Sequence, residues 1–87
     1  MSAIARALLA VMAAAAGDVP AARSHLVEAH RHARATARRE RQIVDIATVA
    51  VAGDPVRAAG LAREHVATYP DDAELLARIA PPSAPGA

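Results

Sequence analysis

The sequence predicts an all-α protein built from antiparallel helix–turn–helix repeats, with four main helices and a short fifth. Three observations predict this class. Apolar residues recur at the three- and four-residue spacing of a helix, and no alternating run is long enough for a strand. Of the 87 residues, 26 are Ala, the best helix former. Two Gly-Asp pairs, at residues 17–18 and 53–54, lie 36 positions apart, each between two helical patterns.

The first repeat unit is predicted over residues 2–36. Its first helix ends at Gly17, because glycine tolerates the left-handed geometry of a helix C-terminus. Asp18 then caps the second helix. The apolar stripe of the first helix comprises Ile4, Ala7, Leu8, Val11 and Ala15, and that of the second comprises Ala22, Leu26, Ala29 and Ala33.

The second unit is predicted over residues 37–70. Thr36 is the expected N-cap of its first helix, which ends at Gly53. Asp54 caps the next helix with Pro55 at its first position, where the missing N–H costs nothing, and Pro70 ends it. The apolar faces of these two helices carry Ile43, Ala47 and Ala50, and Val56, Ala59, Ala62 and Val66.

A short capping helix is predicted over residues 71–79. It begins with Asp71-Asp72-Ala73-Glu74, which has the spacing of a capping box. Residues 1–80 therefore form one domain, and the Pro- and Ala-rich tail of residues 81–87 is expected to be disordered.

The Gly-Asp turns and the residues that follow them resemble those of tetratricopeptide repeats. Such repeats place a small residue five positions after the Gly and a Pro about seventeen after it, as Gly53, Ala58 and Pro70 do here. Residues 37–76 also resemble the bacterial tetratricopeptide repeat protein 38 family, through an Ala-Gly-Asp turn and a Tyr-Pro-Asp-Asp ending. The resemblance implies an interaction scaffold and no catalytic residues. The sequence departs from the repeat pattern at Arg34, which replaces the Pro, and at Arg6, Ala10, Gln42 and Ile46.

Composition excludes several classes of protein. The absence of Cys excludes disulfide scaffolds, thiolate metal sites and cysteine nucleophiles. No apolar run approaches the roughly 20 residues that span a bilayer. The missing Lys, Asn and Phe all have AT-rich codons, which indicates a high-GC bacterial genome. We expect a cytoplasmic protein; the alternative is an exported one in which residues 1–16 are a cleaved signal peptide.

No catalytic, cofactor or metal site is predicted. His25, Glu28, His30 and His32 form a cluster of ligand types, but His25 and His32 lie about 10 Å apart along a helix, too far for one tetrahedral ion. None of the few hydroxyl residues lies in a phosphate loop or nucleophile elbow. Asp45 is the acid expected to be partly buried, paired with Arg41.

We therefore expect a non-catalytic protein–protein interaction module that associates with itself. Apolar residues surround the first helix, which should therefore be covered by another chain. Residues 23–41 carry a net charge of +4 and residues 42–87 a net charge of −3, and such opposite charges suit self-association. The candidate interface comprises Leu8, Val11, Met12, Arg31, Arg34 and Arg38. One alternative is a binder of nucleic acid or another anionic ligand through residues 23–41. Another is the terminal part of a longer repeat protein with no separate activity.

Overall fold

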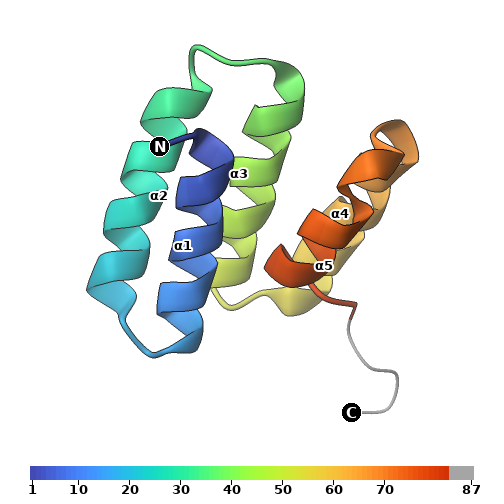
Figure 1. The fold of residues 1–87 in the computed structure, drawn as a ribbon. Coiled ribbons are helices and arrows are strands. Elements are labelled where there is room, and N and C mark those ends of the chain that lie inside the picture. The colour runs from blue at the N-terminus through green and yellow to red at the C-terminus, as the bar shows by residue number, and fades with distance from the viewer. Residues whose placement is uncertain (83–87) are drawn as a thin grey trace.

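The computed structural model describes residues 1–82, which form five α-helices and one turn of 3₁₀-helix (Figure 1). The predicted all-α class is confirmed, and no strand occurs in these residues. The elements are α1 (Ala3–Ala15), α2 (Val19–Ala33), α3 (Arg38–Val51), α4 (Pro55–Thr68), η1 (Pro70–Asp72) and α5 (Ala73–Ile79).

The two Gly-Asp pairs form turns of the same geometry. Gly17 lies just after α1 and Gly53 just after α3. Both have positive φ angles, of 82° and 88°. Asp18 accepts a hydrogen bond from the backbone N–H of Ala21 at 3.1 Å, and Asp54 accepts one from Arg57 at 3.2 Å. Each aspartate thus satisfies an N–H group that the helix leaves without an internal partner.

The start of α3 differs from the prediction that Thr36 is its N-cap. The hydroxyl of Thr36 donates to the carbonyl of Ala33 at 2.9 Å, back toward the end of α2. Ala37 occupies the N-cap position in an extended conformation, with no side-chain hydrogen bond to the helix. The Nη1 group of Arg41 donates to the carbonyl of Thr36 at 2.6 Å. This hydrogen bond joins the α2–α3 connection to α3.

After α4 the chain turns sharply into α5. The backbone N–H of Tyr69 still donates to His65, and Pro70 then begins η1. The predicted capping box, which pairs Asp71 with Glu74, does not start α5: Asp71 lies inside η1, and Asp72 occupies the N-cap position with no side-chain hydrogen bond to the helix. Pro81 and Pro82 are exposed and not helical, whereas residues 83–87 of the predicted tail lie outside the described residues.

The helices form two layers. Figure 1 shows α1 in front of α2 and α3, with α5 beside α1 and in front of α4. The Cα atoms span 35 × 31 × 16 Å, and the shortest extent fits two helices packed about 8–10 Å apart. Helix α1 packs against α2, α3 and α5, so part of the surface expected to need another chain is covered by α5.

The core combines small and large side chains from different helices. Its largest fully buried side chains come from α3 and α5: Ile43, Val44, Leu76 and Ile79. Helices α1 and α2 contribute mostly alanines: Ala3, Ala7, Ala10, Ala22, Ala29 and Ala33. Small side chains at this contact allow the two backbones to approach closely, and the alanine content therefore serves the packing of α1 on α2.

Candidate functional site

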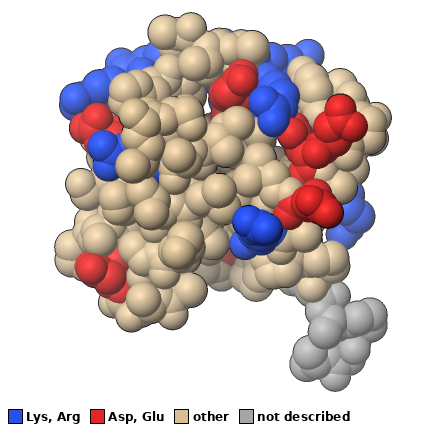
Figure 2. Space-filling view, viewed as in Figure 1, with Lys and Arg blue, Asp and Glu red and all other residues tan. Residues whose placement is uncertain are grey.

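The outward side of α1 is an uncharged surface, which we call the α1 face. It consists of Ala5, Leu8, Leu9, Met12 and Ala16. Leu8 and Leu9 are half-buried, whereas Met12 is 64% exposed. The one charged residue of α1, Arg6, contacts Nδ1 of His25 on α2 at 3.2 Å. Figure 2 shows the uncharged surface over α1, with charged side chains around its margins.

An open pocket of about 390 Å³ lies where the ends of α1, α3, α4 and α5 meet, and we call it the end pocket. Val11, a predicted interface residue, lines it from α1. None of its lining residues is charged: Val11, Ala14, Ala15, Ala50, Val51, Gly53, Pro55, Ala58, Ile79, Ala80 and Pro81. Its position next to the α1 face extends the uncharged surface beyond one helix.

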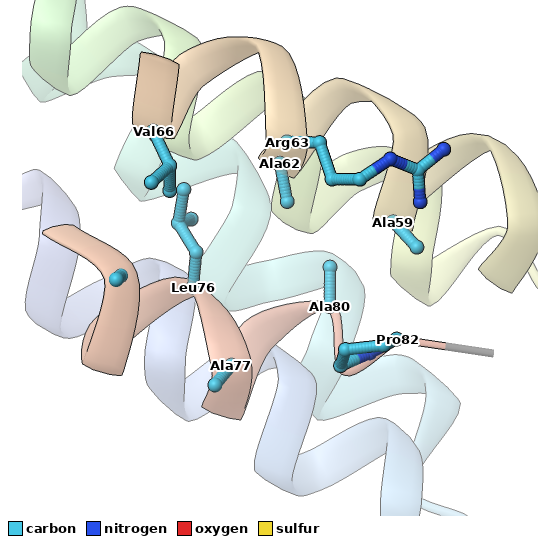
Figure 3. Close-up of a pocket in the computed structure, with 9 residues that line it drawn as sticks. Ala59, Ala62, Arg63, Val66, Leu76, Ala77, Ala80 and Pro82 are labelled. Atoms are coloured by element: carbon cyan, nitrogen blue, oxygen red, sulfur yellow. The ribbon is translucent and has the colours of Figure 1, made fainter. Parts of the chain in front are cut away.

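A second apolar hollow, the α4–α5 groove, has a volume of about 260 Å³ (Figure 3). Alanines from both helices form most of its walls, with Val66 and Leu76 facing each other at one end. Arg63 is the single charged residue that lines it. Ala80 lines both this groove and the end pocket, so the two hollows lie on either side of the end of α5.

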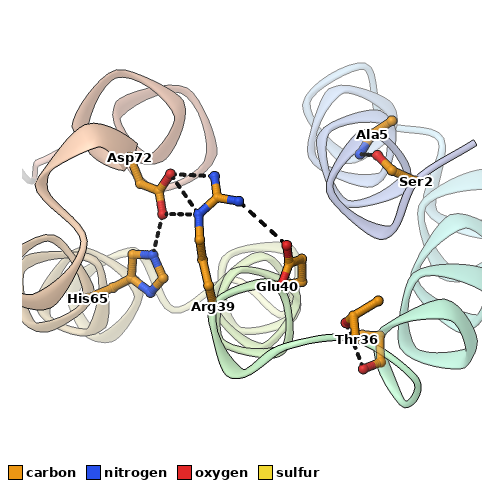
Figure 4. A network of polar contacts seen from close by, with 8 residues as sticks. Ser2, Ala5, Thr36, Arg39, Glu40, His65 and Asp72 are labelled. Carbon is orange, nitrogen blue, oxygen red and sulfur yellow. Dashed lines mark hydrogen bonds and ion pairs between the residues drawn. The ribbon is translucent and has the colours of Figure 1, made fainter.

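A buried polar network joins α3, α4 and η1 (Figure 4). Nε of Arg39 donates to the Asp72 carboxylate at 2.8 Å, and Nη2 donates to its other oxygen. Nε2 of His65 donates to the same carboxylate at 2.7 Å, while Nδ1 lies 2.8 Å from the Gln42 amide oxygen. Nη1 of Arg39 lies 3.5 Å from Glu40. The ring of Tyr69 packs against the ring of His65 with their centroids 4.8 Å apart.

The network holds Asp72 in its ionised form. The hydrogen bond from Arg39 lowers the pKa of Asp72 most, burial opposes this, and the hydrogen bond from His65 lowers it further. The same bond raises the pKa of Arg39. An Asp-His pair can serve as an acid–base couple, but the His65 side chain is only 1% exposed and both its ring nitrogens are already hydrogen-bonded. The arrangement therefore fixes α5 against α3 and α4.

Arg39 and His65 lie in no motif that predicts this network, and the capping box that includes Asp72 assigns it no buried partner. The buried side of α4 carries Ala58, Ala59, Ala62 and His65, and not Val56 as predicted, which is 69% exposed. The spacing of His65 from Ala58 and Ala62 is the one signal of its burial in the sequence. Asp45, the acid expected to be partly buried and paired with Arg41, is exposed and forms no ion pair within residues 1–82. The buried acid is Asp72 instead.

The histidines of the sequence cluster make separate contacts and do not form one site. His25 meets Arg6, and Nε2 of His30 lies 2.8 Å from the hydroxyl of Thr48 on α3. His32 is exposed. No group of three potential metal ligands occurs among the described residues.

The predicted basic interface residues lie at the end of the molecule opposite the end pocket. Arg31 pairs with Glu28 at 3.3 Å, and both side chains remain partly exposed. Arg34 and Arg38 flank the α2–α3 connection, are exposed, and form no ion pair within the described part of the chain. That connection separates Arg31 on α2, and Arg34 directly after this helix, from Arg38 and Arg41 on α3. The six predicted interface residues thus fall into two groups, one apolar and one basic.

No protein-family model, curated protein or solved structure matches the chain. Among residues 1–82, none of the helices has the length and hydrophobicity needed to cross a membrane.

Proposed function

We propose that the chain is a non-catalytic protein–protein interaction module that associates with a second copy of itself. The observation that carries this proposal is the uncharged surface formed by the α1 face and the end pocket. Monomeric proteins rarely expose large contiguous apolar patches, and such patches mark interaction sites. Leu8, Val11 and Met12 belong to this surface.

The area that a dimer needs explains why both parts are required. A stable interface buries about 800 Å² per partner, which is about 15% of the chain's 5360 Å² surface. Helix α1 has 13 residues and is therefore about 20 Å long. The α1 face alone is too narrow for that area, whereas the α1 face and the end pocket together extend across the ends of four helices.

The proposed module consists of two helix–turn–helix repeat units. At both Gly-Asp turns the glycine N–H donates to the carbonyl three residues before it, and the aspartate N–H donates to the carbonyl five residues before it. This equivalence, with the matching caps, supports two related units at 2–36 and 37–70 in the manner of tetratricopeptide repeats. Repeats of this kind present extended surfaces for protein partners.

The test is the molar mass in solution, measured by light scattering over a range of concentrations at low and high salt. We expect a mass of at least twice the 8.9 kDa of one chain, with little dependence on salt because the contact is apolar. Met12→Asp should return the protein to a monomer. Val27→Asp is the matched control, because Val27 is 58% exposed on α2, outside the uncharged surface.

Circular dichroism should show that both variants keep the helical content of the wild type. A wild-type chain that stays a monomer at hundreds of micromolar would contradict self-association. Equal effects of the two substitutions would contradict the placement of the interface on the α1 face.

A further inference from the structure

We propose that a small pocket at the junction of α2 and α3 binds a phosphate-type oxyanion. The pocket has a volume of about 100 Å³ and is lined by His30 and Ala33 of α2, by Arg34 directly after this helix, and by Arg41 and Asp45 of α3. At about 30 Å³ for each water molecule, this is room for about three waters or one tetrahedral oxyanion. We call it the junction pocket.

Two guanidinium groups line the junction pocket without a carboxylate partner. All nine acidic residues of the chain lie among the described residues, and neither Arg34 nor Arg41 forms an ion pair with any of them. Bringing like charges together costs free energy that an anion between them would recover. Asp45 is the single acid in the lining, and it too forms no ion pair.

The walls of the pocket are held in place by hydrogen bonds to the backbone and between helices. Nη1 of Arg41 donates to the Thr36 carbonyl at 2.6 Å, which leaves its other N–H groups for a ligand. The Thr48 hydroxyl gives its one hydrogen to the Val44 carbonyl, so Nε2 of His30 must donate to the Thr48 oxygen. These contacts fix Arg41 and the ring of His30 before any ligand arrives, which reduces the entropy lost on binding.

The chemistry of the pocket suits a phosphate group. A planar guanidinium donates two parallel hydrogen bonds to phosphate oxygens, and two such groups can bind three or more oxygens. The pocket has room for one phosphate group, and its polar lining residues are exposed, so the rest of a ligand can extend into solvent. Exposed arginines along the upper rim of Figure 2 lie around this end of the molecule and attract anions from solution. The proposed ligand is therefore a molecule that presents a terminal phosphate.

The experiment is a titration of the folded chain with inorganic pyrophosphate at low salt, followed by calorimetry and by amide chemical shifts. Arg34→Gln should weaken binding at least about fivefold, because it removes one charge next to the ligand. Asp45→Asn should strengthen binding about fivefold, because it removes the one negative charge in the lining. Arg57→Gln makes the same charge change on an exposed arginine at the start of α4 and should alter affinity less than twofold.

Four results would overturn the proposal: no binding of pyrophosphate, equal losses in Arg34→Gln and Arg57→Gln, weaker binding in Asp45→Asn, or shifts confined to residues away from the junction. A single-stranded oligonucleotide without terminal phosphates tests the alternative that the basic surface binds the phosphate backbone of a nucleic acid. If it binds more tightly than pyrophosphate and is insensitive to Arg34→Gln, the basic surface binds a charged polymer and the pocket is not the site.

Discussion

The carboxylate of Asp72 accepts hydrogen bonds from Arg39 of α3 and His65 of α4 immediately before α5 begins, so three helices depend on one side chain. Its side chain is only 4% exposed, and water therefore cannot replace these partners if the charge is removed. Breaking one member of a buried hydrogen-bonded ion pair is costly because the other members stay in place without their partner.

Asp72→Asn should lower the free energy of unfolding by about 2–3 kcal/mol. This figure is below the usual cost for a fully buried pair because Arg39 keeps contact with Glu40 and is 38% exposed. Urea unfolding at a fixed protein concentration measures the change. The neighbouring exposed Asp71→Asn is the control and should change stability by less than about 0.5 kcal/mol.

The lowered pKa of Asp72 also predicts how stability depends on pH. Arg39 and then His65 hold this pKa below the ordinary value of 3.8, so the folded chain binds this proton less readily than the unfolded chain does. The resulting stability is fully present above the unfolded pKa and is lost as pH falls through the folded pKa. Acid titrations of stability should therefore be steeper below about pH 4 for the wild type than for Asp72→Asn. Identical acid profiles would contradict this role.

At the scale of the elements, the two Gly-Asp turns are the most demanding positions of the backbone. Gly53→Ala should destabilise the protein by about 1–2 kcal/mol, because its φ of 88° disfavours any L side chain although no atom lies within 4 Å of an added Cβ. Gly60→Ala is the matched control inside α4, where an added Cβ meets only the end of Arg63 at 3.8 Å. It should stabilise the protein by about 0.5–1 kcal/mol. Thermal melts of both variants measure the difference, and equal effects would contradict the explanation.

The helices themselves could be predicted from local sequence signals. Gly17, Gly53 and Pro70 end helices for reasons that lie in their own backbone preferences, and Asp18 and Asp54 cap the helices that follow. Thr36 does not cap α3, and Asp72, which occupies the N-cap position of α5, does not cap that helix, because both side chains have polar partners elsewhere. Thr36 bonds back to α2, and Asp72 bonds to residues 33 and 7 positions away in the chain. Capping patterns cannot register such competition from tertiary contacts.

The candidate site could be predicted only in part. Apolar residues on all sides of α1 predicted a surface in need of a partner. Leu8 and Met12 lie on the α1 face, and Val11 lines the end pocket. The end pocket could not be predicted, because it forms where the ends of four helices meet and no local pattern specifies that meeting. The coverage of α1 by α5 was missed for the same reason.

At the scale of the whole molecule, charge and hydrophobicity are separated in space. The basic residues around the α2–α3 connection lie at one end, and the uncharged end pocket lies at the other. The exposed acids of residues 42–87 lie on α3, at the start of α4, on α4, in η1 and on α5: Asp45, Asp54, Glu64, Asp71 and Glu74. With a net charge of only +1, the chain has little long-range repulsion to oppose association through its uncharged surface.

The packing of Tyr69 against His65 has an optical consequence. The chain has no Trp and no Phe, so Tyr69 is its one aromatic chromophore other than histidine. It lies at the end of α4, just before η1, beside the Asp72 network. Tyrosine fluorescence therefore reports on this junction alone, whereas far-ultraviolet circular dichroism reports on all the helices together. The two signals change at the same denaturant concentration only when α5 detaches in the same cooperative step that unfolds α1, α2 and α3.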